Sequence, residues 1–332
     1  MKYLIVGTGA LGSIFGGFLH LSGREVGFLG RGPHFEKIRK EGLLIRGIWG
    51  EHWVRNIRTF SSPRKITLPS EIVLMCVKSF DTEQAIKDVA PFMAQDGLVV
   101  SLQNGLGNLE KIAEQVGSER TIGGRVIFGV EIPRPGEARV TVYADKVLLG
   151  FMEGAGEPDE ARTRIRAMAD EFNQALIPTR AVEAITPFIW AKVLYNCALN
   201  PLAALLQVTY GELGSNQETR AVMREIVEET YQVAERLGIP LPQRTAQEYF
   251  NYLMNQLIPA TASHHASMLQ DLQQGRRTEI DALNGAVGRL AENLGLSVPA
   301  NRLITRLIHF CESRPGSIRR DHEENRKEEK NQ

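Results

Sequence analysis

Residues 2–13 read KYLIVGTGALGS and contain the pattern that decides the fold. The apolar run at 2–6 is typical of a buried strand, and Gly7, Gly9 and Gly12 follow it in the G-x-G-x-x-G spacing. Between a strand and a helix, these glycines allow a tight bend, room for a pyrophosphate against the backbone, and close helix-strand packing. Free N–H groups at the helix start attract phosphate. The pattern predicts a dinucleotide site, and a glycine-rich turn without a ligand is the alternative.

Further apolar runs extend this start into an α/β domain. Residues 25–29, 71–77 and 98–103 are nearly continuous in apolar side chains, as expected of parallel strands buried on both faces. Residues 121–150 are expected to add antiparallel strands to the sheet. A sheet of this kind needs helices in the connections between its parallel strands.

Helical patterns occupy those connections. One helix is predicted to begin at Asp81, with a capping box to Gln84, and to run to about Met93. A polar helix is predicted over residues 158–176. After about residue 182 no strong strand signal remains, and the pattern predicts helices alone. These later helices are expected at 184–207, 216–237, 242–274 with a break near Pro259, 278–294 and 299–312.

Strand-helix alternation followed by helices predicts an α/β fold class: an N-terminal Rossmann-type dinucleotide-binding domain, then an all-α C-terminal domain. We place the first domain at residues 1–180 and the second at 181–312. Residues 313–332 are highly charged and nearly devoid of apolar side chains, so we expect a disordered tail.

Composition narrows the class of partner. Lys plus Arg equals Asp plus Glu at 39 each, so neither a nucleic-acid nor a membrane partner is supported, and a small molecule is expected. Three distant cysteines without a CxxC pair or clustered histidines indicate no disulfide framework and no metal site. The N-terminus is read as strand, turn and helix and not as a signal peptide. A cytoplasmic protein fits these features best. Apolar helices in the second half allow a homodimer, although periodicity does not separate such an interface from an intramolecular core.

The ends of the predicted parallel strands carry further candidates for cofactor binding. Arg31 follows the second strand, where an acidic residue would favour NAD, and no Asp or Glu stands between Val26 and Phe35. An arginine there suits the 2′-phosphate of NADP. Lys78 and Asn104 follow two other strands, and ligands of parallel sheets bind at this edge. Hydrated loop residues are the alternative. The candidate cofactor-binding set from the glycine turn is Gly7, Gly9, Ala10, Leu11 and Gly12.

A second motif suggests chemistry. Residues 190–201 read WAKVLYNCALNP, and Lys192, Asn196 and Asn200 recur at intervals of four, which places them along one helix face. Reduction of a ketone needs a proton as well as a hydride, and a buried lysine is suited to supply it. The two amides could bind substrate oxygens. On spacing alone, a solvated helix face is at least as good an interpretation.

A polar cluster follows at residues 266–285, ASMLQDLQQGRRTEIDALNG. Ser267, Asp271, Glu279 and Asn284 are expected on helices flanking Gly275. A carboxylate here could orient the lysine or bind a substrate hydroxyl. Periodicity alone does not favour Glu279 over Asp281, and surface positions are the alternative for each residue.

These motifs occur in the order and spacing of a known family. GTGALGS, VKSFDT, QNGLGN, WAKVLYNCALNP, SMLQDLQQGRRTEIDALNG and NRLITRLI together resemble the ketopantoate reductases (2-dehydropantoate 2-reductases), over about residues 1–310. The resemblance implies reduction of 2-dehydropantoate to pantoate with NADPH, on the way to pantothenate and coenzyme A. It also implies a C-terminal domain like that of 6-phosphogluconate dehydrogenase, with the site in the cleft between the domains.

The resemblance also implies residue roles. Lys192 matches the general acid. Glu279 matches the carboxylate that positions the substrate and assists turnover, and Glu279 is also counted among the residues near the cofactor. Asn196, Asn200 and Ser267 match substrate-binding positions. The remaining matches lie in the first domain: Lys78 and Asn104 face the nicotinamide end of the cofactor and the reacting centre, and Arg31 meets the 2′-phosphate. Asn104 counts in both the substrate and the cofactor set.

Two alternatives to this function stay open. The same chemistry could act on another branched or hydroxylated 2-oxo acid. A non-catalytic nucleotide sensor could use the same fold, but it would need no proton donor, and the presence of Lys192 and Glu279 counts against it.

Overall fold

The computed structural model describes residues 1–152 and 159–314. Within them the chain divides into two compact units, Met1–Val193 with Ile239–Pro242, and Leu194–Gly238 with the residues from Gln243 on. The change of unit falls inside a helix, whereas the predicted limit at residues 180–181 falls in a strand. The predicted domain limits stay a prediction, and all but the first two residues of the predicted tail, 313–332, lie outside the described residues.

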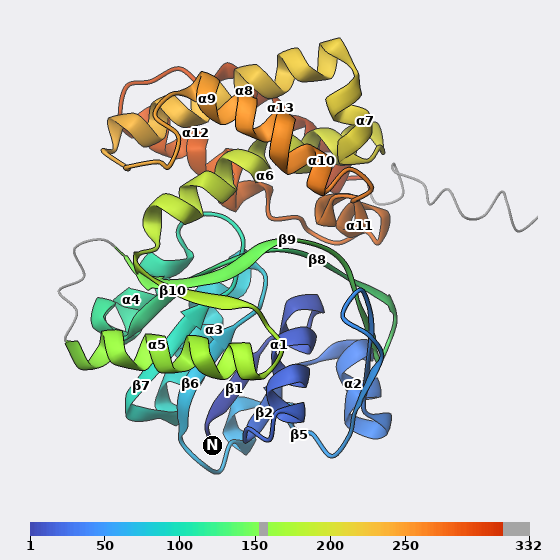
Figure 1. Cartoon of the computed structure of the whole chain (residues 1–332), viewed down its shortest axis with the longest axis vertical. Helices are drawn as coiled ribbons and strands as arrows, with labels where there is room; N and C mark the ends of the chain where they lie inside the picture. Colours follow the sequence, from blue (N-terminus) through green and yellow to red (C-terminus); the bar gives the residue numbers. More distant parts are fainter. Residues whose placement is uncertain (153–158, 315–332) are drawn as a thin grey trace, which may run out of the picture. The chain divides into compact units, whose positions relative to one another are not determined.

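The first unit is built on a ten-stranded mixed sheet, counted over the described residues (Figure 1). Nine strands follow the order β4-β3-β9-β8-β7-β6-β1-β2-β5, and β10 pairs with β9. The strands are β1 (Tyr3–Val6), β2 (Val26–Leu29), β3 (Leu43–Gly47), β4 (His52–Val54), β5 (Arg58–Phe60), β6 (Ser70–Met75), β7 (Met93–Ser101), β8 (Thr121–Arg134), β9 (Glu137–Phe151) and β10 (Thr179–Ala184).

Helices cover both faces of this sheet. On one face, α1 (Ala10–Leu21), α2 (Gly32–Glu41) and α5 (Asp159–Gln174) share a buried core with alternate residues of β1, Tyr3 and Ile5. On the other face, α3 (Thr82–Val89) and α4 (Asn108–Val116) pack on the side that carries the remaining β1 side chains. Alternation along a doubly covered strand explains why β1 is apolar throughout. The Rossmann-type α/β prediction is confirmed, including the antiparallel pair β8-β9.

Several local predictions for this unit were wrong. Asp81 forms no capping hydrogen bond, because α3 is preceded by a 3-10 turn at Ser79–Asp81, and Gln84 bonds Asp88 instead. The helix ends at Val89, before a 3-10 turn that contains Pro91. Four short strands, β3, β4, β5 and β10, were not predicted. They lie towards the edges of the sheet, and polar or exposed positions shorten their apolar runs, whereas the predicted β1 and β2 are buried throughout.

The second unit is helical, as predicted. Three helices closely match their expected ranges, α6 (Thr186–Leu206), α8 (Gln217–Arg236) and α13 (Pro299–Glu312). The helix expected at 242–274 is more broken than predicted, because a π-helical turn and Pro259 interrupt it. The elements of the remaining regions are α7 (Tyr210–Ser215), α9 (Ala246–Tyr252), the π turn η5 (Leu253–Leu257), α10 (Ile258–Ala260), α11 (Ser267–Gln273), the 3-10 turn η6 (Ile280–Ala282) and α12 (Asn284–Asn293).

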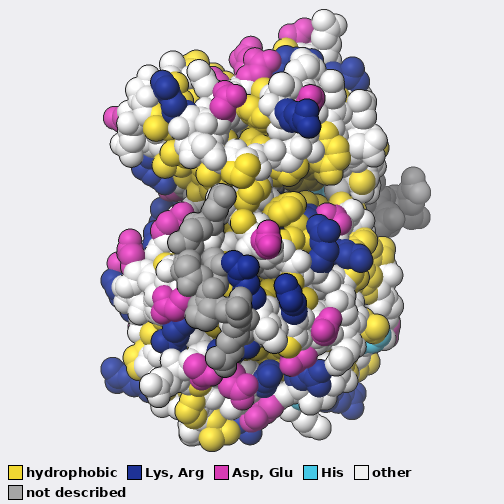
Figure 2. Space-filling model, turned by 60° about the vertical axis from the view of Figure 1, so that its left-hand side comes forward, with side chains coloured by type: hydrophobic (Ala, Val, Ile, Leu, Met, Phe, Trp, Pro, Cys, Tyr) yellow, Lys and Arg dark blue, Asp and Glu magenta, His cyan; other side chains and the backbone are white. Residues whose placement is uncertain are grey.

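Acidic and basic side chains are interspersed on the face of the protein that Figure 2 shows. By length and composition, helix α6 could cross a membrane. However, 72% of its apolar 18-residue stretch is buried within the protein. Such burial is typical of a core helix, and one helix of this kind is weak evidence for a membrane span.

Candidate active site

The glycine turn of the first unit has the local geometry that the three predicted roles require. Gly7 has φ +97°, and a Cβ there would lie 2.7 Å from the backbone nitrogen of Val77. A Cβ on Gly12 would lie 2.0 Å from the carbonyl oxygen of Gly7, so the helix can approach the turn only without a side chain. At Gly9 a Cβ would meet nothing within 4 Å. The middle glycine therefore borders open space, which fits a group that approaches the backbone closely.

Helix α1 begins at this open space. Gly9 precedes its first residue, Ala10, and no side chain caps the helix N-terminus. The first turn contains no acidic residue, so nothing competes with an anion for its N–H groups or for the positive end of the helix dipole. The turn has the shape and the polarity that a pyrophosphate requires.

The predicted strand-end residues follow neighbouring parallel strands. β7, β6, β1 and β2 lie side by side and run parallel, so their carboxyl ends share one edge with the glycine turn. Asn104 follows β7, Lys78 follows β6, and Arg31 follows β2. Arg31 is 90% exposed, and its guanidinium lies 3.8 Å from the carboxylate of Asp81. An exposed pair of this kind is weak, so a bound phosphate could take its place.

A buried polar network orders the two loops that carry Lys78 and Asn104. The side-chain amide of Gln103 donates to the carbonyl of Val77 at 2.9 Å and to the hydroxyl of Thr82 at 2.7 Å. Asn108 accepts from Thr82 at 2.9 Å and donates to the carbonyl of Asn104 at 2.8 Å. Sequence reasoning missed these three polar residues, although Gln103 and Asn108 lie within the QNGLGN motif and Thr82 lies within VKSFDT.

The lysine-asparagine stripe lies on one continuous helix, α6. Lys192 is half-buried, whereas Asn196 and Asn200 are 4% and 5% exposed. The amides therefore do not form the solvated face that was the structural alternative. Within the described residues, the buried Nδ2 of Asn196 has no hydrogen-bond partner. Buried amide donors are nearly always bonded, so this one indicates a missing acceptor.

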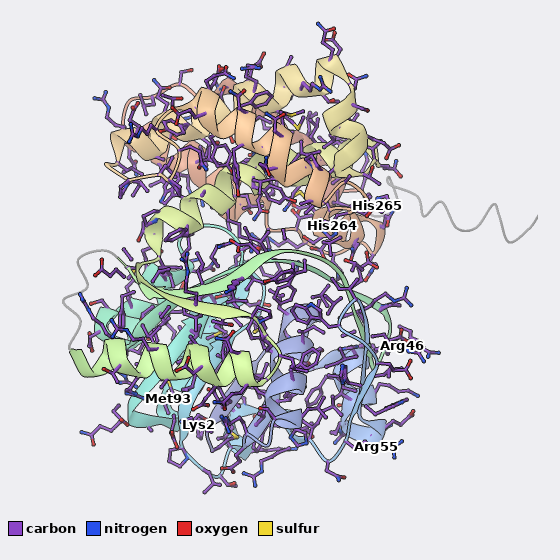
Figure 3. All side chains as sticks on the ribbon, viewed as in Figure 1. Lys2, Arg46, Arg55, Met93, His264 and His265 are labelled. Atoms are coloured by element: carbon purple, nitrogen blue, oxygen red, sulfur yellow. The ribbon has the colours of Figure 1, made fainter. Side chains whose placement is uncertain are left out.

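Aromatic residues of the second unit fix the orientation of Asn200. The Tyr210 hydroxyl donates to its Oδ1 at 2.5 Å, which leaves Nδ2 as the donor end of the amide. The Tyr210 ring packs edge-on against Tyr195 and His264. Burial and the neighbouring Tyr195 raise the pKa of Tyr210 well above its ordinary value. Burial, assisted by His265, lowers the pKa of His264 to about 4, so this cluster stays uncharged at neutral pH. Figure 3 shows the neighbouring His264 and His265.

Pro201 leaves a gap in the hydrogen bonding of α6, and a side chain fills it. In a regular α-helix the carbonyl of Cys197 would accept from the N–H of residue 201, but proline has none. The Nδ2 of Asn284 donates to this carbonyl at 3.1 Å and to Asn301 at 3.0 Å. Asn301 in turn donates to Glu229 at 2.8 Å. The LNG segment therefore supports the turn of α6 that carries Asn196 and Asn200.

Replacement of Asn284 with alanine should destabilise the protein by about 2–3 kcal/mol, because it leaves the buried Cys197 carbonyl without a donor. Urea unfolding measures this loss. Asn293→Ala, at the exposed end of the same helix, is the matched control and should change the free energy of unfolding by less than about 0.5 kcal/mol. Equal effects of the two changes would show that Asn284 does not support α6.

The structure separates Glu279 from Asp281, which periodicity could not do. Glu279 is 8% exposed, and the preceding Thr278 accepts the N–H of Ile280, which orders the backbone around it. Asp281 instead pairs with Arg277 and His309, each at 3.0 Å, near the surface. Burial opposes ionisation of Asp281, but these partners outweigh it and lower its pKa. Glu279 precedes the turn η6, so its predicted helical position was wrong.

The other members of the predicted cluster have different surroundings. Ser267 is the first residue of α11 and is half-buried. Asp271 is 2% exposed and accepts from Arg276 at 2.8 and 3.0 Å, which closes the loop after α11. Asp271 thus has a structural partner, whereas Ser267 remains a substrate-binding candidate. In the described part of the chain, no group of three or more His, Cys, Asp or Glu side chains could hold a metal.

Two family models match the chain. "Ketopantoate reductase PanE/ApbA" matches residues 3–154, and "Ketopantoate reductase PanE/ApbA C terminal" matches residues 184–312. The chain belongs to the ketopantoate reductase family. A 2-dehydropantoate 2-reductase of Aquifex aeolicus is 39% identical over 308 residues, covering 93% of this chain and 96% of that protein. One of Pyrococcus horikoshii is 33% identical over 316 residues, covering 95% and 99%.

Solved structures agree with this family assignment. A PanE/ApbA family ketopantoate reductase from Ralstonia eutropha has a TM-score of 0.82 at 30% identity, covering 95% of this chain and 99% of that one. A ternary structure of D-mandelate dehydrogenase with NADH and anilino(oxo)acetate has a TM-score of 0.85 at 26% identity, covering 94% and 99%. The fold of this ketopantoate reductase family member therefore also occurs in a protein named D-mandelate dehydrogenase.

Proposed function

We propose that this protein reduces 2-dehydropantoate to pantoate with NADPH, in pantothenate and coenzyme A biosynthesis. The observation that carries the proposal is the buried, unbonded Nδ2 of Asn196, on the helix that also carries Lys192 and Asn200. Such a donor suits an oxygen-rich substrate. Family membership supplies the substrate class, because the similar proteins are 2-dehydropantoate 2-reductases.

The first unit would hold the cofactor. The open space at Gly9 and the uncapped start of α1 fit the pyrophosphate, and Ala10 and Leu11 contribute N–H groups in the same turn. Arg31 would bind the 2′-phosphate, and Lys78 and Asn104 would contact the nicotinamide end. When bound, NADPH supplies the hydride.

Side chains of this protein would supply the rest of the chemistry. Lys192 donates a proton from Nζ to the oxygen of the substrate ketone as negative charge develops there. Asn196 and Asn200 bind substrate oxygens through their amide N–H groups without adding charge, and Ser267 contributes a hydroxyl. The carboxylate of Glu279 accepts a hydrogen bond from a substrate hydroxyl and positions the substrate near the cofactor.

Arg31 should determine the preference for NADPH. Arg31→Ala is expected to raise the KM for NADPH by about 10–100-fold, since a hydrogen-bonded contact between charged groups contributes roughly 1.5–3 kcal/mol. The KM for NADH should change little, because NADH lacks the phosphate. Initial rates at varied cofactor concentration measure both values. An equal loss with the two cofactors would argue against phosphate recognition by Arg31.

The direct test of the function is a rate measurement. Purified protein should consume NADPH when 2-dehydropantoate is added, with pantoate as the product, and NADH serves as the cofactor control. Cofactor binding without NADPH consumption on any 2-oxo acid would instead support the nucleotide sensor.

A second candidate is reduction of a different 2-oxo acid. The similarity to D-mandelate dehydrogenase favours it, because that protein binds NADH and an aromatic oxo acid analogue. A site built around amide donors should discriminate strongly against a substrate that lacks the matching hydroxyl. Comparison of kcat/KM between 2-dehydropantoate and phenyl(oxo)acetate separates the two candidates.

We also propose a cytoplasmic homodimer. Helix α13 exposes Leu303, Leu307 and Phe310, at 60%, 44% and 54%, in the i, i+4, i+7 spacing of one helix face. A second copy of the chain would bury this stripe. Sedimentation should give a dimer that Leu303→Glu with Leu307→Glu dissociates, whereas a monomeric wild-type protein would contradict the proposal.

A further inference from the structure

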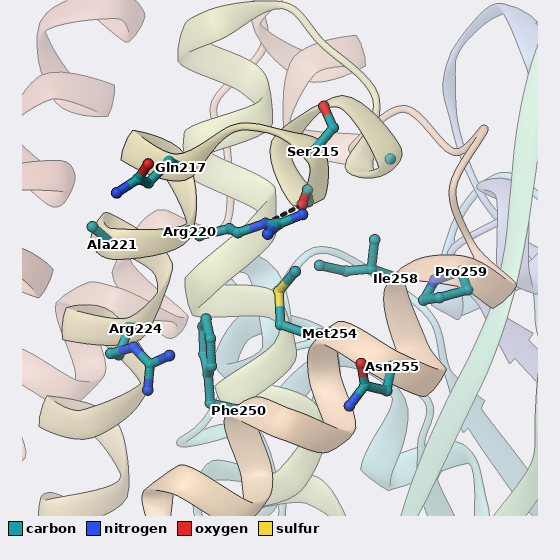
Figure 4. A pocket seen from close by; sticks show the side chains of 12 residues that line it. Ser215, Gln217, Arg220, Ala221, Arg224, Phe250, Met254, Asn255, Ile258 and Pro259 are labelled. Carbon is teal, nitrogen blue, oxygen red and sulfur yellow. Dashed lines mark hydrogen bonds between the residues drawn. The ribbon is translucent and has the colours of Figure 1, made fainter.

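Helices α7, α8, α9 and α10, with the π turn η5, surround a pocket of about 640 Å³ in the second unit (Figure 4). This volume is within the range of small-molecule sites. None of the candidate catalytic or cofactor-binding residues lines it. The lining residues are Gly211, Gly214, Ser215, Gln217, Arg220, Ala221, Arg224, Phe250, Met254, Asn255, Ile258 and Pro259.

Two arginines on α8 supply the charge of this pocket. Arg220 and Arg224 lie one helical turn apart, and like charges at this spacing disfavour an isolated helix by about 0.2–0.5 kcal/mol. No acidic side chain is among the lining residues. Over residues 1–152 and 159–314, neither guanidinium forms a salt bridge. The pocket therefore has an uncompensated positive charge.

Neutral groups hold both guanidiniums in place. Arg220 donates through Nε to the carbonyl of Gly214, at the end of α7. Arg224 donates to Gln247 at 2.5 Å and lies with its Cζ 4.2 Å over the ring of Phe250. Each of these two hydrogen bonds uses one of the five N–H donors of a guanidinium, so several remain for a ligand. Preorganised arginines of this kind favour carboxylate and phosphate groups.

Another part of the pocket wall is apolar. Phe250 and Ile258 are buried and Met254 is half-buried; in Figure 4 Phe250 lies beside Arg224, and Met254 lies near Arg220. Asn255 and Gln217 add amide groups at the rim. A ligand that matches both walls has an anionic head and a compact apolar body.

We propose that this pocket binds a small organic anion, with its carboxylate or phosphate head on Arg220 and Arg224 and its apolar body against Phe250, Met254 and Ile258. The site is separate from the proposed catalytic residues and does not depend on the proposed function. Structural roles for the arginines, as a cap of α7 and a cover for Phe250, do not account for two unpaired charges facing one pocket.

Methyl NMR of methionine-labelled protein tests the proposal, with the Met254 signal assigned by Met254→Leu. Hexanoate or hexyl phosphate should shift this signal saturably, and the tighter of the two identifies the head group. Hexanol, which lacks the charge, and inorganic phosphate, which lacks the apolar body, should each bind at least about 10-fold more weakly. No shift of Met254 with either hexyl anion would overturn the proposal.

Charge variants decide whether the arginines are responsible. Arg224→Gln should weaken hexanoate binding by about 10-fold or more, whereas Arg236→Gln, an exposed arginine at the end of the same helix, should leave it unchanged. Ala221→Glu adds a carboxylate to the lining while both arginine contacts stay intact, and it should weaken binding even if Arg224→Gln fails to fold. Unchanged binding in Ala221→Glu would overturn the proposal. So would a Met254 signal that depends on protein concentration without ligand, since a second copy would then occupy the pocket.

Discussion

Replacement of Lys192 with alanine is expected to lower kcat for 2-dehydropantoate by about 10²–10⁴-fold, the usual contribution of a positioned proton donor. Lys192 is half-buried, and its Nζ is the proposed proton source for the developing alkoxide, for which bulk water is a poor substitute. Affinity for NADPH should stay the same, because the proposed cofactor contacts lie on the glycine turn and the strand ends. Steady-state rates and a fluorescence titration of NADPH measure the two effects.

Two controls separate proton donation from simple charge. Lys192→Arg keeps a cation that can bind the substrate carboxylate, but it donates a proton poorly, so its KM for 2-dehydropantoate should stay near the wild-type value while its kcat is low. Added methylamine should restore part of the rate of Lys192→Ala. Undiminished turnover in Lys192→Ala would remove the lysine from its proposed role.

The glycine turn should respond differently at its second and third glycines. Gly9→Ala places its Cβ in open space at φ −76°, so the unliganded protein should keep its stability. Because that space is proposed for the pyrophosphate, the Kd for NADPH should rise by about 10–100-fold, equivalent to roughly 1.4–2.8 kcal/mol. Gly12→Ala places its Cβ 2.0 Å from the Gly7 carbonyl, and such overpacking should cost about 1–3 kcal/mol of stability or more.

Thermal unfolding and cofactor titration of the two variants test this difference. A loss of stability in Gly9→Ala that matched the loss in Gly12→Ala would show that the space at Gly9 is structural. Normal NADPH affinity in a stable Gly9→Ala protein would place the pyrophosphate elsewhere.

The fold was predictable where the pattern was long and repeated. Buried parallel strands and long helices give continuous periodic signals, so β1 and α6 were found close to their observed ends. Strands β3 and β10 were missed because polar and exposed positions shorten their apolar runs, whereas β1 is apolar and buried throughout. Their presence depends on pairing with β9, which lies far away in the sequence.

The sequence was enough to name the candidate site residues, but it did not predict their burial or their hydrogen-bond partners. Spacing placed Asn196 and Asn200 on one helix face, but only the structure shows that both are buried. Glu279 could be preferred over Asp281 only after the structure showed that Asp281 pairs with His309. No local sequence pattern reveals this distant partner. Asn284 supports α6 through a hydrogen bond to Cys197, which lies 87 positions earlier in the sequence, so local patterns could not reveal it. Pro201, which makes this support necessary, was visible in the sequence.

The comparison of kcat/KM for 2-dehydropantoate and phenyl(oxo)acetate, with saturating NADPH, tests the central claim most directly. We expect 2-dehydropantoate to be preferred by at least about 10²-fold, because its hydroxyl and its branched body match a site of buried amides and one carboxylate. Equal values, or a preference for phenyl(oxo)acetate, would contradict the proposed function.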